Sequence, residues 1–390
     1  MPAFGIQLEP IHFPLVGNSL VVGVFSLLHI ALAGLSVGFM LLAPVFELRG
    51  LNRPFETDLA HAMTRFTVVV FSASSVLAVI MVELLIGLFP VTTMWVWNQF
   101  RGPLAIGMTA FVVQLLTLYP YYHYWDAIRR CHARLHIALG AVAAFGMLVW
   151  VIVLDGMGSY MLTSAEGAST WANVLNPTWL PLVVHRLIGD FVMAGYATAA
   201  YAGWRLGRRQ DQPEHGYYRY LLKAGWTIGL VSLVLQPFSG LLYAEFIQQS
   251  APAAYEQLVR GPYKGLIYVQ FTLIGLLFLG NYGLAKHLQS ASTSWHWMDG
   301  AMVAGVLLMV GSVGHTGLRR TFLYLLVALT IGALISLRCF GQSQFTGVVR
   351  PSVRHLSIGL GVLSVLIYLT MGTIRETARR PDTVRGSNRI

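Results

Sequence analysis

The chain has 390 residues, of which 56% are hydrophobic and 11% are charged, well under half the charged fraction of an ordinary soluble domain. The net charge is +10, but the basic residues gather at the ends of apolar stretches, which excludes a nucleic-acid-binding surface. Two cysteines and the absence of a Cys-x-x-Cys-His motif exclude a disulfide framework and covalently attached heme. Composition therefore predicts a single integral membrane domain over residues 1–390.

Ten apolar stretches fill most of the chain, and each approaches the roughly 20 residues that a helix needs to cross a bilayer core. In chain order they cover 15–45, 62–89, 103–121, 135–155, 179–205, 221–246, 264–285, 298–316, 321–340 and 353–374. This pattern predicts an all-α membrane protein, a polytopic transmembrane helix bundle of nine or ten helices.

The charge of the connections alternates and predicts the orientation of the chain. Arginines are frequent around 49–65, 129–134 and 205–219, whereas 156–178 has no basic residue. Because basic loops stay in the cytoplasm, the N-terminus is predicted outside, in a multi-pass protein of the bacterial cytoplasmic (inner) membrane. The polar C-terminal tail 375–390 holds five arginines, yet ten spans would place it outside, so nine spans remain an alternative.

Three histidines lie within or at the ends of separate apolar stretches: His29, His185 and His315. Ionisable side chains are costly in hydrocarbon, so those that persist usually mark function. Histidine is a standard axial ligand of heme iron. The alternative is that each histidine packs between helices and hydrogen-bonds to a neighbour. Because all three are expected at similar depth on different helices, together they predict a membrane-embedded heme site.

Charged residues near these stretches have two interpretations. Glu83 and Asp190 are expected to be buried, either in a proton or cofactor role or in structural pairing with an arginine. Arg319 and Arg320 follow the third histidine and are positioned to pair with heme propionates.

A further pair, His132 and His136, is spaced i,i+4, so both side chains can face one ligand on a helix. The arginines beside them favour instead two interfacial side chains at the cytoplasmic end of a helix.

Four short motifs follow one another in a familiar order. They are Val82–Gly87 (VELLIG), Phe100–Ile106 (FRGPLAI), Tyr124–Asp126 (YWD) and Asn176–Pro177 followed by His185. Their order and spacing, over roughly residues 15–320, resemble subunit I of the cytochrome bd quinol oxidases. The resemblance implies a helical bundle that carries hemes near the outer membrane face, oxidises quinol and, with a second subunit, reduces oxygen.

The resemblance also implies roles for individual residues. His29 matches the family's first-helix histidine, a ligand of a high-spin heme, and His185 matches the fifth-helix histidine, a ligand of the low-spin heme b. Gln249, Tyr255 and Glu256 resemble the start of the quinol-binding loop, with Glu256 on the family's functional glutamate. This external segment, about 247–263, is much shorter than in the family and lacks its lysine.

The sequence also departs from the family's pattern. Gly107 and Gln114 stand where the family has two helix-three carboxylates that serve proton delivery. The methionine that completes the low-spin heme site is replaced near Leu273. His315 aligns with a heme-ligating glutamate, which would exchange a carboxylate for an imidazole. Without the carboxylates, the chain is not expected to reduce oxygen by itself at a respiratory rate.

The sequence therefore predicts a membrane cytochrome b subunit, part of a quinol-dependent oxidoreductase, that transfers electrons between the quinone pool and a partner redox complex. The alternatives are a terminal quinol:oxygen oxidase subunit I, or a heme-poor structural anchor of a respiratory complex. The expected cofactors are two or three hemes b, with quinone as substrate. The expected partners are the lipid bilayer, a second membrane subunit, and a periplasmic cytochrome or iron–sulfur protein.

Overall fold

The computed structural model describes residues 10–163, 169–207, 215–261, 264–288, 296–336 and 351–378. These residues are helical almost throughout and contain no β-strand. Nine of the described helices are long and apolar enough to cross a membrane, and one more apolar helix is shorter. The ten predicted stretches each coincide with one of these ten helices, so the predicted all-α polytopic bundle is confirmed.

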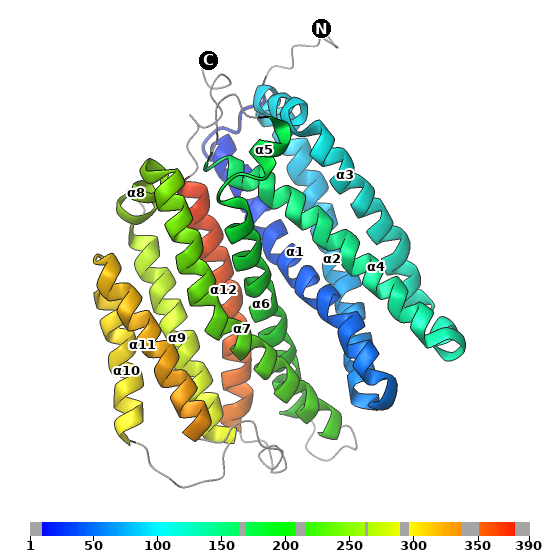
Figure 1. Ribbon diagram of the computed structural model, residues 1–390, viewed down its shortest axis with the longest axis vertical. Helices are drawn as coiled ribbons and strands as arrows, with labels where there is room; N and C mark the ends of the chain where they lie inside the picture. Colours follow the sequence, from blue (N-terminus) through cyan, green and yellow to red (C-terminus); the bar gives the residue numbers. More distant parts are fainter. Residues whose placement is uncertain are drawn as a thin grey trace. The chain divides into compact units, whose positions relative to one another are not determined.

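The helices belong to two compact units, one comprising Met1–Val183 with Glu376–Ile390 and the other Val184–Arg375. The first contains α1 (Asn18–Arg49), η1 (Gly50–Asn52), α2 (Pro54–Leu88), α3 (Pro90–His123), α4 (Trp125–Tyr160) and α5 (Thr170–Val174). The second contains α6 (Trp179–Leu206), which begins shortly before it, α7 (His215–Ser250), α8 (Pro252–Arg260), α9 (Lys264–Leu288), α10 (His296–Gly311), α11 (Thr316–Ser336) and most of α12 (Pro351–Ala378). Figure 1 labels these helices. That 1–390 forms one membrane domain stays a prediction.

Within the first unit, α1 packs against α2 and α4, and α3 packs against α4 (Figure 1). Pro54 and Pro90 begin α2 and α3, where a missing backbone N–H costs no helical hydrogen bond. Pro103 lies inside α3, and the backbone just before it leaves helical geometry at Phe100 (φ −117°, ψ 15°). A second kink interrupts α4 at His132 (φ −145°, ψ 67°).

In the second unit, α6 and α7 approach closely through glycines. A Cβ placed on Gly225 would lie 2.7 Å from the backbone nitrogen of Ala199 and 2.7 Å from the carbonyl oxygen of Gly195. Small residues at such contacts allow the close backbone packing that holds helices together in lipid.

Short helices occupy the two segments that were predicted to lie outside the membrane. Residues 156–178 contain α5, and 247–263 contain α8. The C-terminal tail beyond Ala378 lies outside the described residues.

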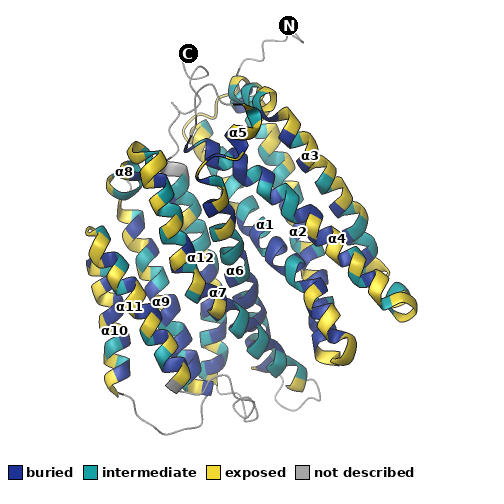
Figure 2. Ribbon diagram, viewed as in Figure 1, coloured by how far each residue is buried: buried dark blue, intermediate teal, exposed yellow. Residues whose placement is uncertain are grey.

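Exposed positions run along the helices and not only at their ends (Figure 2), and many of them are large apolar residues. Examples are Val69, Val76 and Val79 on α2 and Val112 and Leu116 on α3. Exposed apolar surface on this scale is unusual for a soluble protein and is what helices facing lipid present. The few buried polar groups are therefore the informative ones.

Candidate functional site

His29 lies within α1, and its ring is held by α2. Its Nδ1 lies 2.9 Å from the carbonyl oxygen of Ser74 and 3.0 Å from the Ser74 hydroxyl. Because a carbonyl only accepts, Nδ1 donates the proton, and in a neutral ring the lone pair then sits on Nε2. Metal-binding histidines are commonly oriented by such a bond from the other ring nitrogen. The local geometry fits an iron ligand acting through Nε2.

His185 lies near the start of α6, and α7 holds its ring. Nδ1 lies 3.2 Å from the Ser239 hydroxyl and 3.2 Å from Nε2 of Gln236, which also donates to the His185 carbonyl at 3.2 Å. Gly240 leaves room for the ring, since a Cβ there would lie 2.9 Å from its Cε1. An imidazole oriented by polar neighbours fits the chemistry of a heme ligand.

His315 lies in the turn between α10 and α11, because α10 already ends at Gly311. Its side chain is exposed, and its backbone N–H donates to the Ser312 carbonyl at 2.8 Å. Arg320, on the first turn of α11, is half-buried. Their heme roles stay predictions.

Arg319 is buried beside α8 and α9 in the second unit. Its Nη1 donates to the Val313 carbonyl at 3.1 Å, and its guanidinium lies over the Phe271 ring at 5.0 Å. The buried Tyr255 side chain lies near the same guanidinium. Burial of an arginine against an aromatic face and a hydroxyl makes this an electropositive, partly apolar site.

The predicted quinone-binding residues do not share one face of α8. Tyr255 points inward, whereas Glu256 is exposed and pairs with Arg260 at 3.4 Å. Gln249, at the end of α7, is also exposed and donates to Glu245 at 3.4 Å. The quinone role of Gln249, Tyr255 and Glu256 stays a prediction.

The expected burial of Glu83 is wrong, whereas that of Asp190 is confirmed. Asp190 is fully buried and accepts a hydrogen bond from the Tyr368 hydroxyl at 3.0 Å. Glu83 is exposed on α2. It follows Ser74 by nine residues, about two and a half helical turns, so it faces away from the side that contacts α1. A heme role for Glu83 stays a prediction that this exposure does not favour.

Gly107 and Gln114 are both buried on α3. A Cβ on Gly107 would lie 2.5 Å from Cε3 of Trp150, so that ring fills the space a side chain would need. The side chain of Gln114 is fully buried, and neither amide atom has a hydrogen-bond partner among the described residues. Such an orphaned amide is a usual place for an ordered water.

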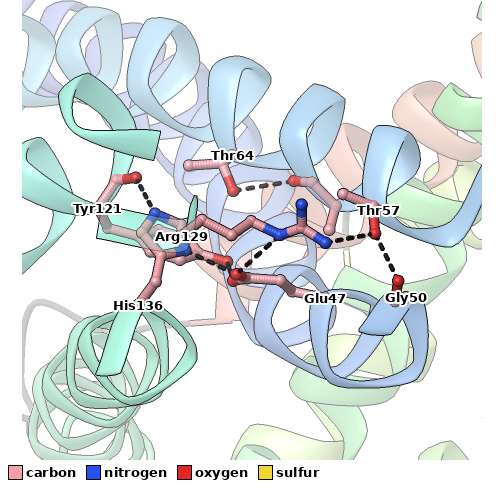
Figure 3. A network of polar contacts seen from close by, with 8 residues as sticks. Glu47, Gly50, Thr57, Thr64, Tyr121, Arg129 and His136 are labelled. Carbon is pink, nitrogen blue, oxygen red and sulfur yellow. Dashed lines mark hydrogen bonds and ion pairs between the residues drawn. The ribbon is translucent and has the colours of Figure 1, made fainter. Parts of the chain in front are cut away.

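The sequence analysis missed a polar cluster that joins α1, α3 and α4 (Figure 3). Glu47 is fully buried, and its carboxylate contacts Nδ1 of His136 at 2.6 Å and the Tyr121 hydroxyl at 2.7 Å. His132 lies exposed at the α4 kink while His136 is buried, so the two do not face one ligand. The sequence feature that could have revealed the cluster is Glu47 itself, a carboxylate that follows the apolar part of a membrane helix.

One comparison with known proteins identifies a family, and another establishes the fold. The family model described as cytochrome bd terminal oxidase subunit I matches residues 20–277. Among solved structures, a chain of the bd oxidase from Geobacillus thermodenitrificans superposes with a TM-score of 0.56 at 15% sequence identity. The match covers 93% of this chain and 98% of that chain, and at this identity it establishes the fold. No curated protein matches the sequence.

Proposed function

This chain belongs to the cytochrome bd terminal oxidase subunit I family, and from that premise we propose that it is the heme-holding, quinol-oxidising subunit of a respiratory oxidase in the bacterial cytoplasmic membrane. The observation that carries the proposal is the hydrogen bond from Nδ1 of His29 to the Ser74 carbonyl. It sets the ring tautomer that a metal ligand on Nε2 requires.

The residues of the chain position the cofactor, which supplies one-electron transfer when bound. His29 presents an imidazole from α1, and His185 presents another from α6, where Gln236 and Ser239 fix the orientation of its ring. We propose two or three hemes b, with His315 as a further ligand.

Quinol oxidation releases two electrons and two protons, so the quinol site needs polar groups that bind the headgroup and accept protons. We place it at α8. Tyr255 and Arg319 form a buried polar edge that can hydrogen-bond a quinol oxygen, and the exposed Glu256 carboxylate can take up a proton. A second membrane subunit completes the proposed assembly.

The test of heme binding is the heme content of purified variants, measured as pyridine hemochrome per protein. His29→Ala and His185→Ala should each lose heme, while His287→Ala, at an exposed position on α9, should not. Unchanged heme content and spectra in both ligand variants would contradict the assignment. A chain that holds no heme at all would support the structural-anchor alternative.

One observation favours a second function, in which electrons pass between quinone and a partner redox complex without oxygen reduction. Trp150 fills the space beside Gly107, and the Gln114 amide does not titrate, so neither position can deliver protons to a buried iron. Oxygen uptake by the purified complex with excess reduced quinol separates the two functions. Cyanide-sensitive uptake at tens of turnovers per second, within the usual range for enzymes, supports the oxidase. Heme reduction without oxygen uptake supports the partner-directed function.

A further inference from the structure

Glu47 is enclosed at the end of α1 by groups from α3 and α4 (Figure 3). Its Oε2 accepts from the Tyr121 hydroxyl at 2.7 Å, and its Oε1 lies 2.6 Å from Nδ1 of His136. Arg129 approaches the same oxygen, with Nε at 3.7 Å. Both Glu47 and His136 are fully buried.

The hydrogen bonds fix how many protons this pair holds. Nε2 of His136 lies 2.9 Å from the Tyr121 carbonyl oxygen, which can only accept, so Nε2 carries a proton. The Tyr121 hydroxyl proton is directed to Oε2. The short contact between Nδ1 and Oε1 then requires one more proton, since two lone pairs would repel. The pair is either imidazolium with carboxylate or imidazole with carboxylic acid.

A pocket of about 510 Å³ is lined by Arg129, the side chain that approaches Glu47. It is lined by η1, by the start of α2 and by Arg129, with Thr57 and Asp58 on its wall. Arg129 separates the pocket from Glu47: its Nη2 donates to the Thr57 hydroxyl at 2.9 Å, while its buried Nε has no hydrogen-bond partner among the described residues. Rotation of this one side chain would open the carboxylate to the pocket.

The contact between α3 and α4 extends from the Glu47–His136 pair to Gln114. Tyr121 and Gln114 are seven residues apart, about two turns, so they lie on one face of α3 roughly 10 Å apart. Glycines of α4 face both: a Cβ on Gly140 would lie 2.6 Å from Cζ of Tyr121, and one on Gly146 would lie 3.1 Å from Cβ of Gln114. The orphaned amide of Gln114 marks a polar, buried point in this seam where water can bind.

We propose that Glu47 and His136 form a proton-uptake site. A proton from the pocket passes Arg129 and binds the pair, giving imidazolium with carboxylic acid, and the pair releases it along the α3–α4 seam toward Gln114. No electron is transferred in this step. This site goes beyond the proposed function. It would supply the protons that side chains at Gly107 and Gln114 cannot deliver. Its protonation does not depend on heme or quinol.

Other titratable groups surround the pair and belong to its electrostatic setting. His61 of α2 stacks on Trp125 at 4.5 Å, and that indole packs edge-on against His136 at 4.7 Å. The charged groups on the wall of the pocket are Arg53, Asp58 and Arg129, and the Tyr121 hydroxyl faces the pair itself. Asp126 and Arg65 act on His61.

Infrared titration of the full chain tests the site directly. The unmodified protein should show a carboxylic-acid C=O band that changes in intensity with pH and that shifts in D₂O. Glu47→Gln should abolish the band. Glu56→Gln should leave it in place, because this equally buried carboxylate is paired with Arg49 and Arg53 instead.

Absence of the band at every pH would overturn the proposal and leave a permanently ionised structural pair, and a band that does not respond to pH would overturn it as a permanently protonated carboxyl. If Glu47→Gln does not accumulate as folded protein, Tyr121→Phe keeps the test decisive. Its hydroxyl donates to Oε2, so its loss must shift the frequency of the band. An unchanged frequency would contradict the assignment to Glu47.

Turnover provides a second readout. In the complete quinol-oxidising complex, Glu47→Gln should lower proton uptake and oxygen uptake by about a hundredfold, while heme content and heme reduction by quinol stay unchanged. Unchanged turnover would contradict the uptake role. Loss of heme from unmodified protein would count against the proposed function alone, and the infrared result would still decide the proton site.

Discussion

His29 and His136 are the same residue type on two helices of the first unit, yet their surroundings give them opposite chemistry. Nδ1 of His29 meets a backbone carbonyl, so Nδ1 carries a proton and the lone pair of the neutral ring lies on Nε2. Nδ1 of His136 meets a carboxylate, and its Nε2 already donates to a carbonyl. The comparison teaches that the partners of the two ring nitrogens separate a metal ligand from a proton carrier.

Replacing each histidine is the largest test of this contrast. His29→Ala should lose the heme that it ligates, because no other side chain would present a lone pair at that point. His136→Ala should keep its full heme content, since neither of its ring nitrogens presents a lone pair to iron. Pyridine hemochrome per folded protein measures both. Equal heme loss in the two variants would break the comparison.

Removing the carboxylate should strongly destabilise the α1–α4 contact. Glu47→Ala leaves an imidazolium or an orphaned imidazole in a fully buried site, and breaking such a pair typically costs about 3–5 kcal/mol. Thermal unfolding in detergent measures the loss, with the exposed Glu256→Ala as control. A loss no larger than that of the control would show that the pair does not hold these helices together.

The sequence was sufficient to predict the helices, because the length of each apolar stretch alone identifies a membrane-spanning helix. It singled out His29 and His185 because a histidine within an apolar segment stands out, and because the motifs around them resemble those of the family; their roles as heme ligands stay predictions. It could not show which way Glu83 points, since that depends on the face of α2 that meets α1. It also could not pair Glu47 with His136, 89 residues apart, because that contact follows from the kink at His132 and the packing of α1 on α4.

A smaller effect tests whether the Trp150 ring leaves room for a side chain at position 107 of α3. Gly107→Ala places a Cβ 2.5 Å from the Trp150 ring, and overpacking of this kind costs about 1–3 kcal/mol. Gly23→Ala, within α1 and with nothing within 4 Å of the added Cβ, should be neutral or stabilising. Unfolding of the two variants side by side gives the difference. Equal stability would mean that Trp150 yields and that a longer side chain could be accommodated there.

The smallest effect concerns what sets the tautomer of His29. Ser74→Ala removes the hydroxyl at 3.0 Å but keeps the carbonyl at 2.9 Å. Stability should fall by about 1 kcal/mol, the usual contribution of one hydrogen bond, and heme content should not change. A Ser74→Ala protein that folds but loses heme would show that the hydroxyl, and not the carbonyl, orients the ring.

The proposed function requires that this chain hold heme and draw electrons from quinol. The most direct measurement is the absorption spectrum of the purified, oxidised protein before and after anaerobic addition of reduced quinol. We expect reduced heme b bands to appear in the unmodified protein and to be diminished in both His29→Ala and His185→Ala. Protein that binds heme but is not reduced by quinol, or that binds no heme, would contradict the account.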